Sequence, residues 1–248
     1  MNVLVACEES QRVCIEFRKL GHMAFSCDLQ ECSGGHPEWH IQGDVLQLLN
    51  GDCTFKTSDG LGHTQSGKWD LLIAFPPCTY LSNAGACRLF KNEEDEGEFK
   101  GINVERLKKG ILGRDFFMQM LRADCKYICV ENPTPSSVFA LPPSTQAIQP
   151  YMFGHPYTKR TNLWLKNLPG LIPTNLVEPI GPWVCGNSEI WKKQAENGVV
   201  YGKEKDVVHR SKTFSGIASA MADQWSKYIE SGGIYDVVDD HIQFKLFD

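Results

Sequence analysis

Residues 71–85, with the sequence LLIAFPPCTYLSNAG, are the stretch that decides the fold. An apolar run stops at two prolines, and a cysteine and a small polar turn follow. An apolar run of this length that ends at a breaker predicts a buried strand. Proline has no N–H group and a fixed φ, so Pro76 and Pro77 end the strand and stiffen the chain behind it. Because ligands bind at the carboxyl ends of strands in an open α/β sheet, Cys78 is placed where a nucleophile is useful. The alternative is that Cys78 is one of ten ordinary thiols, held in a proline turn.

The chain before this stretch begins with a strand–helix–strand pattern. Residues 2–6 and 23–28 are apolar runs, and Val13, Phe17 and Leu20 recur at the spacing of one helix face. Such a unit joins neighbouring parallel strands, so we expect a parallel sheet. The second run ends with Asp28. Its carboxylate can bind the ribose hydroxyls of a nucleoside cofactor, and the alternative is that Asp28 is only a solvated strand end.

The cysteine segment resembles the catalytic motif of the cytosine-C5 DNA methyltransferases, Pro-Pro-Cys-x-x-(Phe/Leu)-Ser-x-Ala-Gly. Thr79 stands where that family usually has glutamine, and Cys78 stands where amino-methyltransferases have an aromatic residue, which argues against transfer to an exocyclic amine. The resemblance implies that Cys78 is the nucleophile and that Ser82 lies beside the substrate. The positions in register are Pro76, Pro77, Cys78, Leu81, Ser82, Ala84 and Gly85.

The same resemblance implies an α/β fold, namely a Rossmann-like class I methyltransferase sheet with helices on both faces and a small irregular appendage. It also implies S-adenosyl-L-methionine as the cofactor. The first loop, residues 7–11, contains no glycine. A cofactor without phosphates needs no phosphate-binding loop, and the acidic side chains of this loop suit the ammonium or sulfonium charge of S-adenosyl-L-methionine. An altered cofactor is an open alternative. For Asp44 the alternative is a helix N-cap. The expected cofactor-binding residues are Ala6, Cys7, Glu8, Asp28, Asp44, Val45 and Pro76.

A second motif follows the apolar run at residues 126–130, which predicts a further strand. Glu131-Asn132-Pro133 ends that run, where the resembled family has Glu-Asn-Val. The resemblance implies that Glu131 protonates the target base and that Asn132 orients Glu131 or the exocyclic amine. Lys159 and Arg160 stand near the place of a basic segment of that family and are expected to bind substrate, since an arginine there can bind phosphate.

The rest of the chain divides by composition. We expect a catalytic and cofactor-binding domain at 1–169, a short irregular recognition region at 170–212, a returning C-terminal helix at 213–230 and a tail at 231–248. Within the first domain, residues 51–68 and 134–150 are expected to be a surface loop and a linker or lid. Residues 104–121 suggest one helix, or two broken near Gly110 and Gly113. Residues 92–98 form an acidic run, expected to be a mobile loop that closes over the substrate.

Net charge and composition bear on the partners and the cellular location of the protein. The net charge of −5 gives no global basic field for nucleic acid, so binding needs a local basic face. No apolar run is long enough to cross a bilayer, no signal peptide is evident, and the scattered cysteines suit free thiols in a reducing cytosol. We therefore expect a cytoplasmic protein, in the host cytoplasm if a phage encodes it. Zinc at Cys27, Cys32, His36 and His40 is a less favoured alternative, and no metal is assigned.

Together these observations predict a small, phage-like enzyme that transfers a methyl group to carbon 5 of cytosine in DNA. The cytosine is expected to be flipped out of the duplex and attacked by Cys78. The short recognition region leaves RNA or a free pyrimidine nucleotide open as substrate, and a non-catalytic nucleic-acid-binding relative is a further alternative. The oligomeric state and the target sequence are not specified.

Overall fold

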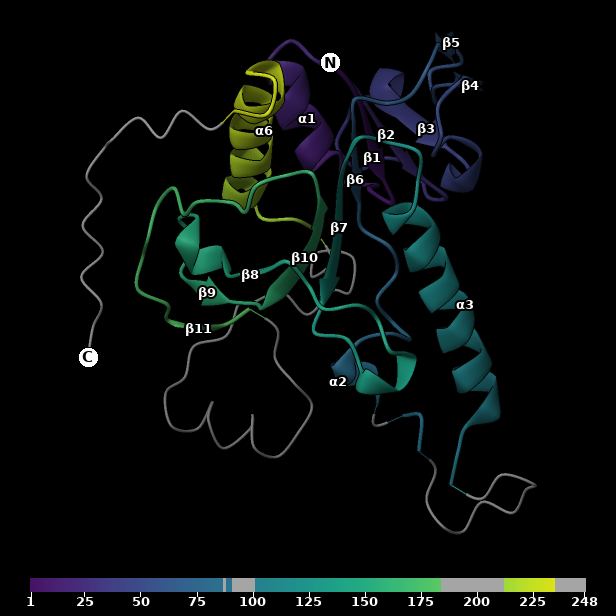
Figure 1. Ribbon diagram of the computed structural model, residues 1–248, viewed down its shortest axis with the longest axis vertical. Helices are drawn as coiled ribbons and strands as arrows, with labels where there is room; N and C mark the ends of the chain where they lie inside the picture. Colours follow the sequence, from purple (N-terminus) through teal and green to yellow (C-terminus); the bar gives the residue numbers. More distant parts are fainter. Residues whose placement is uncertain (87, 91–100, 184–211, 235–248) are drawn as a thin grey trace.

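The computed structural model describes residues 1–86, 88–90, 101–183 and 212–234. A seven-stranded sheet runs through the middle of the molecule (Figure 1). Its strands lie in the order β3, β2, β1, β6, β7, β10, β8. Their bounds are β1 Asn2–Ala6, β2 Met23–Asp28, β3 His40–Gln42, β6 Leu71–Ala74, β7 Tyr127–Pro133, β8 Gln146–Ile148 and β10 Thr161–Lys166.

The pairing within this sheet confirms the expected fold class. The β2–β1, β1–β6 and β6–β7 pairs are all parallel, whereas β10 runs antiparallel to both β7 and β8. The four residues of β6 are fully buried, as the uninterrupted apolar run of a strand covered on both faces requires. A parallel sheet with one reversed strand next to its last strand is the Rossmann-like sheet of the class I methyltransferases.

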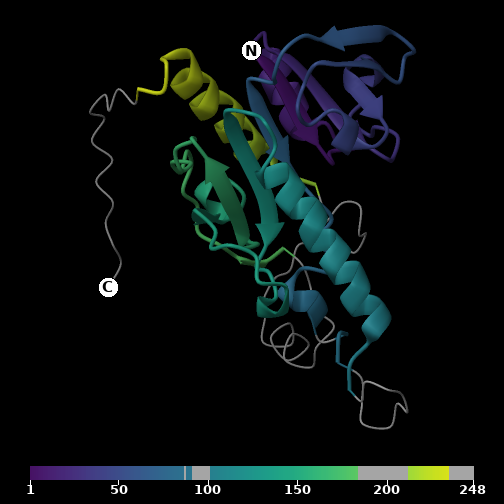
Figure 2. The same ribbon diagram turned by 45° about the vertical axis from the view of Figure 1, so that its right-hand side comes forward.

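Helices cover both faces of the sheet (Figures 1 and 2). Helices α1 (Arg12–Lys19) and α6 (Ser215–Glu230) lie side by side on one face, and α3 (Val104–Leu121) covers the other. In α6, Ile217, Met221 and Trp225 point together into the core, as their spacing predicts. No helix in the described ranges is both long and apolar enough to span a bilayer.

Helix α3 is continuous, so the alternative of two helices is wrong. Asn103 caps its start, accepting a hydrogen bond from the backbone N–H of Arg106 at 3.0 Å. Gly110 does not break the helix, because the ring of Phe139 packs where a side chain at this position would stand. Gly113 similarly faces Leu81. Gly110 therefore lets Phe139 approach α3 closely, whereas a Cβ at Gly113 would make an ordinary contact with Leu81, at 3.5 Å.

Two other expectations for irregular chain need correction. The stretch 51–68 contains an antiparallel hairpin of β4 (Cys53–Lys56) and β5 (Gly62–Gln65), held by Phe55 edge-on to Phe25 at 5.0 Å. The stretch 134–150 is not only a linker, because it supplies β8 to the main sheet. Leu20, expected on the buried face of α1, ends that helix and is 49% exposed.

The appendage is small. Strands β9 (Tyr157–Thr158) and β11 (Gly181–Pro182) form a two-stranded parallel sheet beside the main one. Residues 170–183 are otherwise irregular, and the rest of the expected recognition region, like the acidic run at 92–98, lies outside the described residues. The remaining short elements are α2 Asn83–Ala86 and the 3-10 turns Pro37–Trp39, Val45–Gln47, Ser137–Phe139 and Pro150–Met152.

Glu8 holds the start of α1. Its carboxylate accepts hydrogen bonds from the backbone N–H groups of Val13 at 2.7 Å and Cys14 at 3.2 Å. The N-terminal N–H groups of a helix have no partner inside the helix, so this carboxylate satisfies two of them. The side chain is buried, and burial raises the pKa of Glu8 to about 8, although the two hydrogen bonds act in the opposite direction.

This burial predicts a pH dependence of stability. The pKa of Glu8 is higher in the folded chain than in the unfolded chain, so its contribution is complete below about pH 4.5 and is lost as the pH rises towards 8. The free energy of unfolding of Glu8→Gln, measured by urea titration between pH 5 and 8, is expected to change less steeply than that of the wild type. The difference is at most about 1.4 kcal/mol per pH unit. Glu105→Gln, on the exposed side of α3, is the control, and parallel curves for wild type and Glu8→Gln would contradict the expectation.

Candidate active site

Cys78 lies directly behind β6, at its carboxyl end. Pro76 is buried, Pro77 is exposed and Cys78 is half-buried. The carbonyl of Cys78 accepts hydrogen bonds from the N–H groups of Leu81 at 3.1 Å and Ser82 at 2.9 Å, which fold the segment into a tight turn. The prolines and this turn together hold the thiol at the sheet edge, as the sequence predicts.

The same turn is braced by Arg106 of α3, a residue that the sequence did not indicate. Its Nη2 donates a hydrogen bond to the carbonyl oxygen of Thr79 at 2.7 Å, and its guanidinium lies over the ring of Tyr80 at 4.9 Å. Gly85 completes the contact, since a Cβ there would come within 2.6 Å of Arg106 Nη2. The glycine of the motif is thus needed for this packing.

Glu131 reaches the site from the neighbouring strand. The parallel pairing of β6 with β7 ends at Ala74 and Val130, so Glu131 is the first residue beyond it. The sequence predicts that the strand ends before Glu131. In the structure it continues to Pro133, because Glu131 pairs with Leu163 of antiparallel β10. A small cavity of about 20 Å³, roughly the room for one water molecule, lies beside the carboxyl group. It is lined by Phe75, Glu131, Lys159, Thr161, Thr213, Phe214, Ile217 and Met221.

Cys78, Glu131 and Lys159 form one electrostatic group. Burial raises the pKa of Glu131, while the nearby Lys159 ammonium and a hydrogen bond from the Thr161 side chain lower it. Burial also raises the pKa of Cys78, and Glu131 raises it further, whereas Lys159 lowers it. Lys159 is placed by its backbone N–H, which donates to Gln149 Oε1 at 2.8 Å. Arg160, next to it, is exposed.

Asn132 does not join this group. Successive residues of a strand point to opposite faces, so Asn132 points towards α3 while Glu131 points towards α6. It is fully buried opposite Asn162 of β10. Among the described residues, neither polar atom of the Asn132 side chain has a hydrogen-bond partner, and Asn162 Oδ1 has none either. The structure therefore does not bring the Asn132 amide to Glu131, and it leaves a costly pair of buried amides at this end of the sheet.

The expected cofactor residues lie at the carboxyl ends of β1, β2 and β3, except for Pro76, which follows β6. The backbone of Cys7 turns sharply there, with φ of 58°, and the carboxylates of Asp28 and Asp44 both raise the pKa of its thiol, after burial. Asp44 also accepts a hydrogen bond from the N–H of Leu46 at 3.0 Å, the N-cap role that was its alternative. Ala6 and Val45 are buried around this point, whereas the Glu8 carboxylate is turned to α1.

The alternative zinc ligands are dispersed. Cys27 lies in the core, and the two ring nitrogens of His40 contact Ser26 Oγ at 2.9 Å and the carbonyl of Gln30 at 2.9 Å. The backbone of His36 is fixed to the side chain of Gln11. In the part of the chain that the structure describes, no three His, Cys, Asp or Glu side chains are grouped to hold a metal.

The sheet order and the paired strand ends define an α/β fold with a candidate site at the carboxyl edge of β6 and β7. No protein-family model and no curated protein matches the chain. Among solved structures it is similar to a candidate DNA modification methyltransferase encoded within an E. coli prophage, with 12% identity and a TM-score of 0.38. The match covers 66% of this chain and 46% of that one. A likeness this distant adds nothing to the sheet order and assigns no activity.

The brace on the cysteine turn can be tested by hydrogen exchange. Arg106→Gln removes the bond to Thr79 and the charge over Tyr80, so the turn opens more readily. The amides of Leu81 and Ser82 are expected to exchange about tenfold faster, equivalent to the loss of one hydrogen bond of about 1.4 kcal/mol. Lys108→Gln, an exposed substitution on the same helix, is the control. Unchanged exchange in Arg106→Gln would show that the prolines alone hold the turn.

The buried amides give a second prediction. Asn132→Val replaces an unpartnered amide with a β-branched side chain of similar volume, and is expected to raise the free energy of unfolding by about 1–3 kcal/mol. Thermal and urea unfolding measure this. A fall in stability would mean that the amide has a partner in solution. Stabilisation together with loss of activity would assign Asn132 a role in substrate binding or turnover.

Proposed function

We propose that the protein transfers a methyl group from S-adenosyl-L-methionine to carbon 5 of cytosine in DNA, through a covalent bond to Cys78. One observation carries this proposal. The Cys78 thiol and the Glu131 carboxyl stand at adjacent strand ends, and both interact with the Lys159 ammonium. A nucleophile, an acid and a cation in one half-buried site are the groups that this reaction requires.

Each group has a chemical task. Carbon 5 of cytosine is a poor nucleophile until the Cys78 thiolate adds to carbon 6, which gives carbon 5 the electron density of an enamine. Glu131 donates a proton to ring nitrogen 3 as charge builds there, and its raised pKa favours the protonated form that does so. Lys159 offsets part of the cost of forming the thiolate. Once carbon 5 is methylated, loss of its proton breaks the carbon–sulfur bond and frees Cys78.

The residues at the carboxyl ends of β1–β3 fit the proposed cofactor, which supplies the methyl group as a sulfonium electrophile. Asp28 and Asp44 place negative charge around Cys7, which suits a cationic nucleoside. The N–H groups of α1 that hold phosphate in dinucleotide folds are bound to Glu8 instead. A dinucleotide therefore has no anion site here, whereas a cofactor without phosphates does not need one.

DNA is the proposed substrate, and the base must leave the duplex to reach Cys78. RNA or a free pyrimidine nucleotide remains the alternative, because the region available for reading a sequence is short. A purely binding role is disfavoured, since binding does not require an acid and a thiol at adjacent strand ends.

A covalent trap tests the proposal. Fluorine on carbon 5 cannot leave as a proton does, so an oligonucleotide with 5-fluorocytosine is expected to form a stable adduct with the wild type in the presence of S-adenosyl-L-methionine. Denaturing electrophoresis and mass spectrometry would show the adduct on Cys78. Duplex DNA, single-stranded DNA, RNA and the free nucleotide are compared in parallel.

Variants separate the roles in this trap. Cys78→Ser should form no adduct, Glu131→Gln should form it at least tenfold more slowly with cofactor binding intact, and Cys53→Ser on the β4–β5 hairpin should behave as wild type. Methylation at the wild-type rate by Cys78→Ser would exclude the covalent mechanism. Adduct formation with RNA or nucleotide alone would exclude DNA as substrate.

A further inference from the structure

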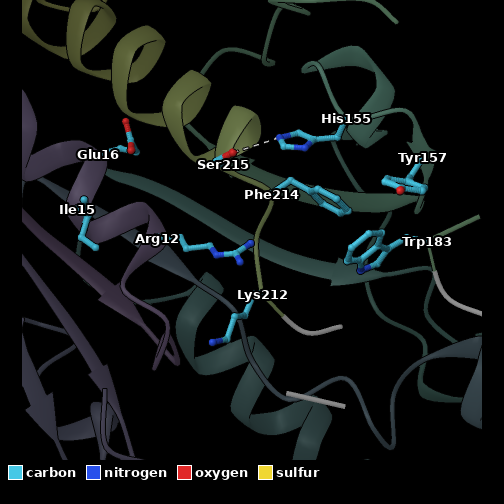
Figure 3. Close-up of a pocket in the computed structure, with 9 residues that line it drawn as sticks. All are labelled: Arg12, Ile15, Glu16, His155, Tyr157, Trp183, Lys212, Phe214 and Ser215. Atoms are coloured by element: carbon cyan, nitrogen blue, oxygen red, sulfur yellow. Dashed lines mark hydrogen bonds between the residues drawn. The ribbon is translucent and has the colours of Figure 1, made fainter. Parts of the chain in front are cut away.

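A cavity of about 610 Å³ opens beside the candidate site, between α1, the start of α6 and the β9–β11 sheet (Figure 3). Its size is that of sites for small organic ligands. None of the expected catalytic or cofactor residues lines it, so the proposed reaction leaves it without a role. Its lining residues are Arg12, Ile15, Glu16, His155, Tyr157, Trp183, Lys212, Phe214 and Ser215.

Two cations project into this cavity (Figure 3). Within the described residues, Arg12 donates one hydrogen bond, from Nη1 to the carbonyl oxygen of Thr213 at 2.6 Å, and a guanidinium has five donors. Lys212 contacts Ser33 Oγ at 2.8 Å and a Glu9 carboxylate oxygen at 3.9 Å. The Lys212 side chain is 12% exposed and Glu9 offsets part of its charge, so Arg12 is the cation with more donors to offer within the part of the chain that the structure describes.

The other titratable groups of the wall do not oppose an anion strongly. Glu16 is paired with Lys19 at 2.6 Å. His155 Nε2 accepts a hydrogen bond from the N–H of Gly216 at 3.1 Å, and burial and the charge of Arg12 lower its pKa, so its ring is neutral at pH 7. The cavity therefore favours a ligand with a negative group.

The opposite wall is aromatic. The rings of Tyr157 and Trp183 lie edge to face with centroids 4.8 Å apart, and Trp183 meets Phe214 in the same way at 5.0 Å. The backbone N–H of Trp183 donates to the carbonyl oxygen of Thr158 at 2.9 Å, which anchors the backbone of Trp183 beside β9. Tyr157 and Trp183 are both half-buried, so ring surface remains for a planar group to stack on.

This cavity adjoins the reaction centre. Phe214 lines both this cavity and the small one beside Glu131. Lys159, which interacts with Cys78 and Glu131, also lies over the Phe214 ring at 6.0 Å. A nucleic-acid strand that delivers a base to Cys78 therefore passes close to the aromatic wall.

We propose that this cavity binds one nucleotide of the DNA strand that carries the target cytosine, with its phosphate at Arg12 and Lys212 and its base on Trp183 and Tyr157. The proposal rests on the proposed function and adds the element that the net charge of −5 leaves unexplained, a local basic and aromatic surface for nucleic acid. The cofactor is the less suitable occupant, since it is a cation at its reacting sulfur and the acidic residues Asp28 and Asp44 do not line the cavity.

The test measures the affinity of a fluorescent oligonucleotide containing cytosine over a series of salt concentrations. Arg12→Gln and Lys212→Gln are each expected to weaken binding and to reduce the slope of log Kd against log salt by about 1, as the loss of one phosphate contact does. Lys56→Gln, the same charge change on the exposed β4–β5 hairpin, should leave affinity and slope unchanged. Trp183→Ala should weaken binding about tenfold with an unchanged slope, and Trp183→Phe should restore most of it.

Further measurements separate this inference from the proposed function. Calorimetry with S-adenosyl-L-methionine alone is expected to give the wild-type Kd in Arg12→Gln and Trp183→Ala, with thermal unfolding as the check on folding. Weakened DNA binding with an intact cofactor Kd supports the inference even if Cys78 forms no adduct. Wild-type DNA affinity and slope in these variants, loss of cofactor binding instead, or a response with RNA or free nucleotide only would each overturn it.

Discussion

The site depends on where two parallel strands stop pairing. Strands β6 and β7 part at Ala74 and Val130, because Pro76 and Pro77 prevent β6 from continuing, while β7 goes on by pairing with β10. The thiol of Cys78 and the carboxyl of Glu131 consequently lie close enough for Glu131 to raise the pKa of Cys78. Antiparallel β10 then brings Thr161 to the Glu131 carboxyl, with Lys159 just before it.

The same geometry separates groups that lie next to each other in the sequence. Glu131 and Asn132 form one dipeptide motif, yet the alternation of a strand sends the first towards α6 and the second into the core beneath α3. The unpartnered amides of Asn132 and Asn162 cost stability there. Unpartnered buried polar groups of this kind are common at functional sites, where function and not stability accounts for them.

Much of the sheet was predictable, since strands covered on both faces are uninterrupted apolar runs and α6 has a clear apolar face. The hairpin β4–β5 was missed because alternate residues such as Thr54 and Lys56 are exposed and polar, which resembles a loop in composition. The brace by Arg106 was missed because it joins residues 27 positions apart, and no local pattern encodes such a contact. The cations Arg12 and Lys212 were missed for the same reason, because only the folded chain brings α1 and the start of α6 together.

The first loop shows how a departure in sequence acquires a physical meaning. Dinucleotide folds place glycines after the first strand so that a phosphate can reach the N–H groups of the helix. In this chain the side-chain oxygens of Glu8 accept hydrogen bonds from those N–H groups, and the loop needs no glycine for close approach of a ligand. The helix start is thereby satisfied before any ligand binds, and negative charge is left to Asp28 and Asp44 on one side of the sheet edge. Lys159, beside Glu131, supplies positive charge at the carboxyl ends of β6 and β7. In the proposed function, the cationic methyl donor would lie at the carboxyl ends of β1–β3 and the target base beside Cys78 and Glu131.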